Sequence, residues 1–453
     1  MTTLNLPPPY TAEQLAALYP SNLELHQVQV IFRHGERTPV APRFQNTGLQ
    51  AFWPYCKSAS LFTAPVLGPD GRWDDLAFRR RLETFGGKGE AVLAASTGSG
   101  KVTDDICLLG QLTDRGRETT LALGHRLRHL YVDQLGFLPS TLAPPEEYYL
   151  RSTSIVRALE SLQQVFTGLY PASHRPTDVP PPVILARSLQ EENLFPNEAN
   201  CRRFAMLSRA FADVAAKRWN DSPEMALLNS KLGKWMPAGG KVAVDGHPRL
   251  SGIMDTVNAT LAHGPETRLP GEFYDEDVRR IMNDFNVDEW YRGYAESVEF
   301  RRLGVGSLLG DIRDRATAVA SGKSQVRLAL MGCHDTTLAG LLASLGAFDQ
   351  KWPPFTSAIA VETFRLKDHR RSFWGRVTGA GADEGWYVRL RYNEKPVVVS
   401  GCKKAGKHLE GNESFCTMEA FKEVVGKIAP TDWRAECMNN MDKKGLPKVE
   451  EVD

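Results

Sequence analysis

The sequence carries almost no net charge and contains no long apolar run. Its 55 lysines and arginines stand against 54 aspartates and glutamates, which gives a formal net charge of +1. Without an excess of positive charge, the chain lacks the electrostatic footprint typical of a nucleic-acid-binding protein. The sequence has no apolar stretch long enough to span a bilayer, so it predicts no transmembrane segment. Any selectivity for anions must therefore come from a few residues gathered locally.

Cysteine is sparse, and the N-terminus lacks the features of a targeting sequence. Seven cysteines occur in 453 residues, and their odd number leaves at least one thiol free. The opening stretch MTTLNLPPPYTAEQLAALYP has no basic region followed by an apolar core, and no arginine precedes Arg33. We therefore expect neither a secretory signal nor a mitochondrial transit peptide. This predicts a cytoplasmic or other intracellular location, in which the cysteines would be separate thiols unless the fold pairs them.

The apolar patterns alternate between strands and helices in a chain too long for one small core. The predicted elements are a strand at 23–33, a helix at 112–136, a strand at 146–154 with a helix after it, and a strand, turn and helix at 325–346. Strands that alternate with helices predict an α/β sheet. In such sheets, ligands bind beyond the carboxyl ends of the strands.

The segments between these elements divide the chain into a core and an insertion. Residues 41–105 are irregular and rich in glycine, proline, serine and aromatic residues, and we interpret them as a long excursion from the core. Residues 206–305 have a helical pattern with little strand character, which predicts an inserted helical cap. The α/β core domain would then comprise residues 24–205 and 306–440, followed by a flexible polar tail at 441–453.

Charged residues gather where three of the predicted strands end. The residues at these ends are Arg33, His34 and Arg37, then Arg151, then His334 and Asp335. Cationic groups this close repel one another unless an anion lies between them. Arginine donates two parallel hydrogen bonds to oxyanions such as phosphate. A neutral imidazole can attack phosphorus, and a carboxylic acid can protonate a leaving oxygen. If the strands are neighbours, the pattern predicts a site for phosphoryl transfer at one edge of the sheet.

These motifs resemble those of a known family. RHGERTP (33–39) is similar to the RHGxRxP signature of the histidine acid phosphatases, a branch of the phosphoglycerate-mutase-like superfamily. RSTS (151–154) and the pair His334–Asp335 resemble the second and third motifs of that family, in the same order. The mutase branch typically has glycine after the second histidine, so Asp335 favours the phosphatase branch. The resemblance covers residues 25–440 and implies a three-layer α/β sandwich with a mostly parallel central sheet.

The resemblance also implies roles for the site residues. His34 would be the nucleophile that forms a phosphohistidine, and Asp335 would protonate the leaving alcohol and then help water to attack. The residues implied to bind the phosphate oxygens are Arg33, Arg37, Arg151 and His334. This scheme needs no metal and no other cofactor, and its partner is a small phosphomonoester.

A closer resemblance concerns the substrate and the cysteines. LALGHRLRHLYV, LFPNEANC and LGAFDQKWPPF are similar to stretches of the lysophosphatidic acid phosphatases within this family. This implies a lysophosphatidate-like substrate, and it implies the disulfides Cys402–Cys416 and Cys201–Cys437.

Three rival functions are compatible with parts of the pattern. A phytase or inositol polyphosphate phosphatase would need a strongly cationic pocket, for which KLGK (231–234), Lys241 and Arg279–Arg280 supply charge. A specialised biosynthetic phosphomonoesterase would share the same motifs. If the protein only bound a phosphate ligand without turnover, we would expect one of the two histidines or the acid to be missing. All of these residues are present.

Two further charged residues near the motifs are expected to be structural. Arg157 lies six residues after Arg151 on the predicted helix, and we interpret it as a structural residue. Glu36 is expected to be a solvated loop carboxylate rather than a third acid in the site. Asp335 could additionally cap the helix that it opens, which is compatible with catalysis.

Overall fold

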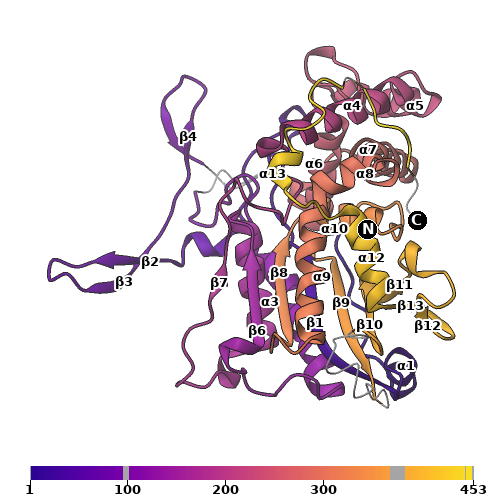
Figure 1. Cartoon of the computed structure of the whole chain (residues 1–453). Coiled ribbons are helices and arrows are strands. Elements are labelled where there is room, and N and C mark those ends of the chain that lie inside the picture. The colour runs from indigo at the N-terminus through magenta and orange to yellow at the C-terminus, as the bar shows by residue number, and fades with distance from the viewer. Residues whose placement is uncertain (1, 95–101, 368–382, 444, 451–453) are drawn as a thin grey trace.

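The computed structural model describes residues 2–94, 102–367, 383–443 and 445–450, and their centre is a nine-stranded sheet (Figure 1). Its strands are β1 (Leu23–Arg33), β6 (Tyr148–Ser152), β7 (Ile184–Leu185), β8 (Leu328–Cys333), β9 (Ala358–Leu366), β10 (Trp386–Tyr392), β11 (Lys395–Val397), β12 (His408–Leu409) and β13 (Asn412–Thr417). The spatial order is β12-β13-β10-β9-β1-β8-β6-β7, with β11 beside β10. Strands β1, β8, β6 and β7 run parallel, whereas β9, β10, β12 and β13 pair antiparallel.

Helices cover both faces of this sheet. They are α1 (Ala12–Leu18), α2 (Asp114–Arg128), α3 (Val156–Leu169), α9 (Ser307–Ala320), α10 (Asp335–Ser344), α12 (Met418–Ile428) and α13 (Trp433–Glu436). Successive side chains of β1 point to opposite faces. Val30 and Phe32 pack in the apolar cluster with α2 and α3, and Ile31 packs in the cluster with α9, α10 and α12. The predicted α/β sandwich is therefore confirmed, and its parallel half contains the three motif strands.

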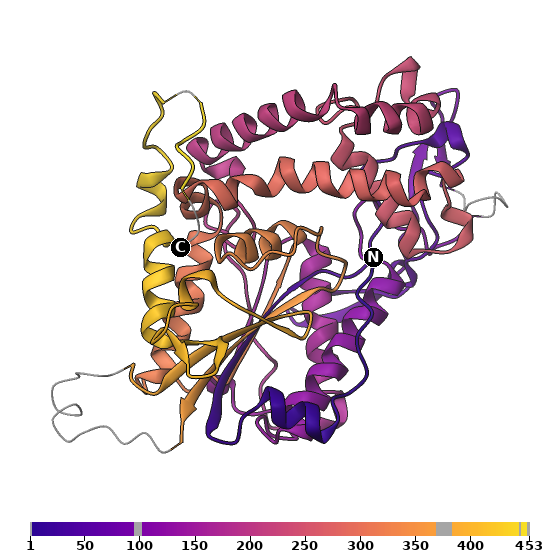
Figure 2. The same cartoon turned by 90° about the vertical axis from the view of Figure 1, so that its right-hand side faces the viewer.

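A group of helices lies above one end of the sheet (Figure 2). These are α4 (Arg202–Trp219), α5 (Pro223–Leu232), α6 (Leu250–Ala262), α7 (Glu276–Glu296) and α8 (Val298–Arg301). They bury an apolar cluster of their own, which includes Met225, Leu232, Ile253 and Phe285. The domain limits at residues 206 and 305 stay a prediction. Helix α4 begins before residue 206, at Arg202, and packs both in the apolar cluster beside the sheet and in that of the helical group.

The excursion at 41–105 forms two hairpins that project from the body (Figure 1). Their strands are β2 (Phe62–Leu67), β3 (Trp73–Phe78), β4 (Glu83–Phe85) and β5 (Ala91–Leu93). At their base, Cys56 is bonded to Cys107. The amide of Cys56 donates to the Asp105 carbonyl at 2.9 Å, and the amide of Cys107 donates to the Trp53 carbonyl at 2.9 Å. The described part of the excursion, 41–94 and 102–105, therefore includes two β-hairpins anchored at a cross-linked base.

Two further disulfides join distant parts of the chain. The structure pairs Cys201 with Cys437 and Cys402 with Cys416, and it leaves Cys333 as a buried free thiol. The described part of the polar tail is attached to the helical group, because Arg301 Nη2 donates to the carbonyl of Glu450 at 2.6 Å. None of the helices within the described ranges is both long and apolar enough to cross a bilayer.

Candidate active site

The three motif segments meet because their strands are parallel neighbours. In the register of the sheet, Arg33 lies opposite Cys333, and Ser152 lies opposite Gly332. The residues that follow these strands therefore reach the same edge. The amide of His34 donates to the Cys333 carbonyl at 3.0 Å, and the ring centroids of His34 and His334 are 5.5 Å apart.

A close approach of two backbones sets the turn after β1. A Cβ atom added to Gly35 would lie 2.3 Å from the carbonyl oxygen of Gly116 in the first turn of α2. Only glycine fits there, because atoms at that separation overlap. This contact turns the chain sharply after His34 and holds the imidazole at the edge of the sheet.

His34 is buried and is held as a neutral imidazole. Its Nδ1 lies 2.8 Å from the Gly35 carbonyl, which can only accept, so Nδ1 carries the proton. Burial, and then the positive charges of Arg157, Arg33 and Arg37, lower the pKa of His34 well below its ordinary value. Among the residues that the structure describes, Nε2 has no hydrogen-bond partner. The lone pair of Nε2 is therefore available to an electrophile.

Arg33 is fixed by three different contacts. Its Nη1 donates to the Pro353 carbonyl at 2.6 Å, and its Nη2 lies 2.7 Å from Oδ2 of Asp335. Its Cζ atom lies 4.1 Å from the ring centroid of Phe355, at cation–π distance. These contacts hold the guanidinium beside His34 with little freedom to rotate.

Arg37 connects the site to the helical group above the sheet. Its Nη2 lies 2.8 Å from Oδ1 of Asp255 on α6, and its Nη1 donates to the Thr38 carbonyl at 3.1 Å. Oδ2 of Asp255 accepts the amide of Val40 at 3.1 Å. The carboxylate from α6 therefore orients Arg37 and fixes the loop that follows the motif.

Arg151 does not join this group, contrary to expectation. Its guanidinium forms a buried ion pair with Glu192, donates to Oδ1 of Asn193 at 2.8 Å, and lies 3.5 Å from Oδ2 of Asp311. The strand end brings Arg151 to the correct edge, but its side chain points into a pocket of carboxylates. Because its charge is already neutralised there, we do not place Arg151 in the anion site.

Arg157 lies in the site instead, although the sequence analysis interpreted it as structural. It stands in the first turn of α3, where its charge acts on His34 and His334. Burial, and then the repulsion of Arg37, lower the pKa of Arg157 to about 10. Its buried Nε has no partner among the described residues. The sequence contained a sign of this role. A cation in the first turn of a helix is repelled by the helix dipole, so a cation at that position indicates that an anion lies nearby.

His334 and Asp335 close the other side of the site. Nε2 of His334 lies 3.2 Å from Oγ1 of Thr153. Burial, and then Arg157, lower the pKa of His334 to about 3. Burial alone raises the pKa of Asp335, but Arg33, Arg37 and a hydrogen bond from Trp352 outweigh it and hold the pKa below its ordinary value.

Glu36 is not solvated, so the expectation for this residue was wrong. Its side chain is fully buried, and it accepts a hydrogen bond from the hydroxyl of Thr119 on α2. The Thr119 hydroxyl also lies 3.0 Å from that of Thr356. The Glu36 carboxylate therefore links the turn after β1 to α2 and is shielded from solvent.

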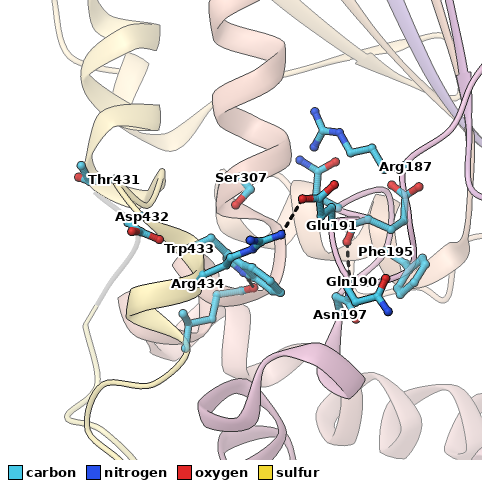
Figure 3. Close-up of a pocket in the computed structure, with 14 residues that line it drawn as sticks. Arg187, Gln190, Glu191, Phe195, Asn197, Ser307, Thr431, Asp432, Trp433 and Arg434 are labelled. Carbon is cyan, nitrogen blue, oxygen red and sulfur yellow. Dashed lines mark hydrogen bonds and ion pairs between the residues drawn. The ribbon is translucent and has the colours of Figure 1, made fainter.

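Two cavities share Phe195 in their lining, and the ring centroid of Phe195 lies 6.0 Å from that of His334. One, of about 520 Å³, is charged at its rim, and Figure 3 shows Arg434 there pointing at Glu191, with which it pairs at 2.6 Å. The other, of about 540 Å³, lies between α4, α7 and the start of α10 and includes Trp290 and Thr336. Its wall is mainly apolar.

The arrangement can bind a dianion and transfer it. Among the described residues, three guanidiniums, from Arg33, Arg37 and Arg157, meet two carboxylates, from Asp335 and Asp255, so a positive charge remains for a ligand. The N-terminus of α3 adds a partial positive charge at the same edge. The unprotonated Nε2 of His34 and the carboxyl group of Asp335 lie among these positive charges. The geometry fits a phosphate ester.

Comparisons with known proteins agree with this geometry. The model of the histidine phosphatase superfamily, branch 2, matches residues 24–393. A probable acid phosphatase of Schizosaccharomyces pombe is 39% identical over 451 residues, which cover 92% of this chain and 95% of the relative. Lysophosphatidic acid phosphatase type 6 of Bos taurus is 29% identical over 423 residues, which cover 92% and 86%.

Solved structures show the same fold. The phytase of Hafnia alvei in complex with tartrate superposes with a TM-score of 0.57 at 14% identity, covering 92% of this chain and 99% of that chain. The multiple inositol polyphosphate phosphatase of Bifidobacterium longum superposes with a TM-score of 0.57 at 12% identity, covering 95% and 98%. At these identities the likeness concerns the fold alone.

Proposed function

The chain belongs to branch 2 of the histidine phosphatase superfamily and is a phosphatase, and we propose that it hydrolyses phosphate monoesters through a phosphohistidine without a metal. The observation that carries this proposal is His34, whose Nδ1 is tied to the Gly35 carbonyl while Nε2 stays free beside three arginines. A neutral imidazole in this tautomer is a nucleophile that is ready to attack phosphorus.

The reaction follows from the positions of the charged groups. The guanidiniums of Arg33, Arg37 and Arg157 bind the phosphate oxygens and stabilise the charge that spreads over them. Nε2 of His34 bonds to phosphorus as the P–O bond to the alcohol breaks. The leaving oxygen keeps the bonding electron pair and takes the proton of Asp335. Asp335, now a carboxylate, accepts a proton from the water that attacks the phosphohistidine, and His34 and inorganic phosphate are released.

This mechanism predicts an acidic optimum for alkyl phosphates. Asp335 must be protonated to donate, and Arg33, Arg37 and Trp352 hold the pKa of Asp335 in the free enzyme below its ordinary value even though burial raises it. As pH rises above that pKa, kcat/KM falls by about tenfold per pH unit. His34 stays neutral over the same range because its pKa is well below its ordinary value.

The measurement is kcat/KM for an alkyl phosphate at several pH values, with p-nitrophenyl phosphate as the control. The nitrophenolate leaving group is a stable anion and needs no proton, so its profile is expected to be shallower. Asp335→Asn should remove the difference between the two profiles. A flat profile for the alkyl phosphate between about pH 4 and 8 would count against Asp335 as the acid.

For the substrate we propose a lysophosphatidate-like phosphomonoester. The apolar cavity of about 540 Å³ reaches Thr336, next to Asp335, and so could accept an acyl chain attached to a phosphate bound at the arginines. Relatives named lysophosphatidic acid phosphatase type 6 support this choice.

A phytase-like activity is the second candidate, motivated by the fold of the structural neighbours. Three of the cations that the sequence offered for a polyphosphate already have carboxylate partners. Lys231 pairs with Asp275, and Lys234 lies 2.7 Å from Glu272. Arg280 lies 3.1 Å from Asp277. A polyphosphate would have to compete with these carboxylates. A specialised biosynthetic phosphatase remains a narrower form of the same proposal, and a non-catalytic binding protein fits poorly with an intact His34 and Asp335.

Filling the apolar cavity tests the substrate proposal. Ala212 on α4 lines the cavity, and Ala212→Phe should raise KM for lysophosphatidate by about tenfold, because several buried methylenes lose their place. The KM for p-nitrophenyl phosphate should change by less than about twofold, since this substrate lacks the chain. Ala210→Phe is the matched control, as it makes the same substitution on α4 outside the cavity lining.

The assay would measure phosphate release at acidic pH with EDTA present. Its panel would hold lysophosphatidate, p-nitrophenyl phosphate, phytate and a sugar phosphate. Preference for phytate would favour the second candidate, and equal effects of Ala212→Phe on all substrates would argue against the cavity as an acyl site. The predicted intracellular location stays a proposal. The three disulfides, in contrast, are more typical of an oxidising compartment.

A further inference from the structure

A short segment after α10, Trp352-Pro353-Pro354-Phe355, contacts both Arg33 and Asp335. The indole Nε1 of Trp352 donates to Oδ2 of Asp335 at 3.0 Å. The Pro353 carbonyl accepts from Arg33, and the Phe355 ring lies against the same guanidinium. This segment therefore touches one phosphate-binding residue and the acid at once.

The segment is held from two sides. On the side of the helical group, the amide of Trp352 donates to Oδ1 of Asn283 on α7 at 3.0 Å, and the Trp352 ring lies 5.0 Å from that of Tyr291. On the other side, the amide of Phe355 donates to the Thr2 carbonyl at 2.8 Å, and the amide of Leu4 donates to the Phe355 carbonyl at 3.1 Å. Backbone contacts of this kind leave the indole little freedom to turn away from Asp335.

The two oxygens of Asp335 have different environments. Oδ2 receives two donors, Nη2 of Arg33 at 2.7 Å and Nε1 of Trp352 at 3.0 Å. Oδ1 receives one, the amide of Thr336 at 2.9 Å. A carboxyl oxygen offers two lone pairs, so both of those on Oδ2 are taken while one on Oδ1 is free. A proton on this carboxyl group must therefore reside on Oδ1.

We propose that Trp352 is a positioning residue for the acid step, which together with Arg33 occupies Oδ2 and so makes Oδ1 the oxygen that donates the proton. The inference rests on the proposed phosphatase mechanism. In that step the P–O bond breaks, its electron pair stays on the leaving oxygen, and the proton passes from Oδ1 to that oxygen. The negative charge left on Asp335 is then stabilised at Oδ2 by Trp352 and Arg33.

Several charged or titratable groups face Asp335 from the elements packed against it. They are Arg33 from β1, Arg37 from the loop after β1, Arg157 from α3, Tyr291 from α7, Cys333 from β8 and His334 beside it. Trp352 differs from the arginines because its indole is an uncharged donor. Removing it alters the hydrogen bonding of Oδ2 without changing the charge of the site.

The variant Trp352→Phe separates proton delivery from general packing. At pH values below the pKa of Asp335, we expect kcat/KM for an alkyl phosphate to fall by about tenfold, because the indole no longer stabilises the negative charge left at Oδ2 and Asp335 becomes a weaker acid. We expect less than about a twofold change for p-nitrophenyl phosphate, whose leaving group needs no proton. Losing a hydrogen-bond donor to the carboxylate raises the pKa of Asp335. The pH above which kcat/KM for the alkyl phosphate declines should therefore rise by about one unit.

Trp219→Phe is the matched control. Trp219 also donates its indole N–H to a carboxylate, Oδ2 of Asp288, at 2.7 Å, but it lies in the helical group and stacks on Phe285. The same substitution there removes the same kind of hydrogen bond away from the reacting atoms. We expect it to leave the ratio of the two kcat/KM values and the pH profile as in the wild type.

A double-variant cycle provides the decisive measurement. If Trp352 acts through Asp335, then Trp352→Phe in an Asp335→Asn background should change kcat/KM for the alkyl phosphate by less than about twofold. Equal losses for both substrates, or a full additional loss in the double variant, would overturn the inference and leave Trp352 as a packing residue. If Trp352→Phe does not fold by circular dichroism, Asn283→Ala loosens the same indole through its backbone contact and should give the same substrate pattern more weakly.

These outcomes are separate from the proposed function itself. Turnover that survives loss of His34 would contradict the phosphohistidine mechanism, whatever Trp352 does. Turnover that depends on His34 while Trp352→Phe affects both substrates equally would contradict only the role of Trp352.

Discussion

Replacing His34 with alanine will abolish phosphate release. In the proposed mechanism the imidazole supplies the electron pair that displaces the alcohol, and the other imidazole of the site, His334, has its Nε2 3.2 Å from Oγ1 of Thr153. We expect kcat to fall by at least about a thousandfold, as is typical when an enzyme loses its covalent nucleophile. The measurement is phosphate release from p-nitrophenyl phosphate and an alkyl phosphate at acidic pH in the presence of EDTA.

The phosphoenzyme gives an independent readout of the same prediction. After rapid denaturation of the wild type during turnover, mass spectrometry should find phosphate on the peptide that contains His34, and the alanine variant should lack it. His26→Ala is the matched control, since His26 lies on the same strand but packs against Trp386 with ring centroids 4.9 Å apart. If His34→Ala kept more than about a tenth of the wild-type rate, the nucleophile would have to be another group.

Arg157→Met is expected to lower kcat/KM, whereas Arg151→Met is expected to lower the folding stability. Arg157 contributes charge to the anion site, so its loss should lower kcat/KM by about a hundredfold while the melting temperature stays close to that of the wild type. Arg151 is fully buried against Glu192, and its loss leaves that carboxylate without its counter-charge. Breaking such a pair costs about 3–5 kcal/mol of folding stability.

Thermal unfolding and kinetics on the same samples separate the two effects. For Arg151→Met we expect a clear drop in melting temperature, with kcat/KM per folded molecule within about threefold of the wild type. The double variant Arg151→Met/Glu192→Gln should recover part of the stability, because it removes the unpaired charge. A large loss of kcat/KM in Arg151→Met without destabilisation would indicate that Arg151, and not Arg157, binds the phosphate.

The local sequence determined the reacting groups and the strands that present them. Arg33 ends the apolar strand β1, His34 follows it, and Asp335 lies two residues after the end of β8, and parallel neighbours bring such positions to one edge. For this reason the meeting of these residues at one edge of the sheet and the α/β architecture could be predicted without coordinates.

Tertiary structure alone decided which third arginine joins Arg33 and Arg37 in the anion site. Arg151 lies in the RSTS motif and Arg157 three residues after it, so either could approach the edge, from β6 or from α3. The choice depends on Glu192 and Asp311, which lie 41 and 160 residues further along the chain and neutralise Arg151. A guanidinium pairs with whichever carboxylate packing brings near, and that proximity is absent from local sequence.

The same reason applies to the residues that orient the site. Asp255 reaches Arg37 from α6, and Trp352 reaches Asp335 from the loop after α10. The burial of Glu36 likewise follows from the close approach of its backbone to Gly116. Sequence by itself determined the chemistry that this protein carries, because reactive groups are tied to strand ends. The partners that orient those groups were decided by the tertiary structure, because hydrogen bonds and ion pairs depend on distances that only the packed chain establishes.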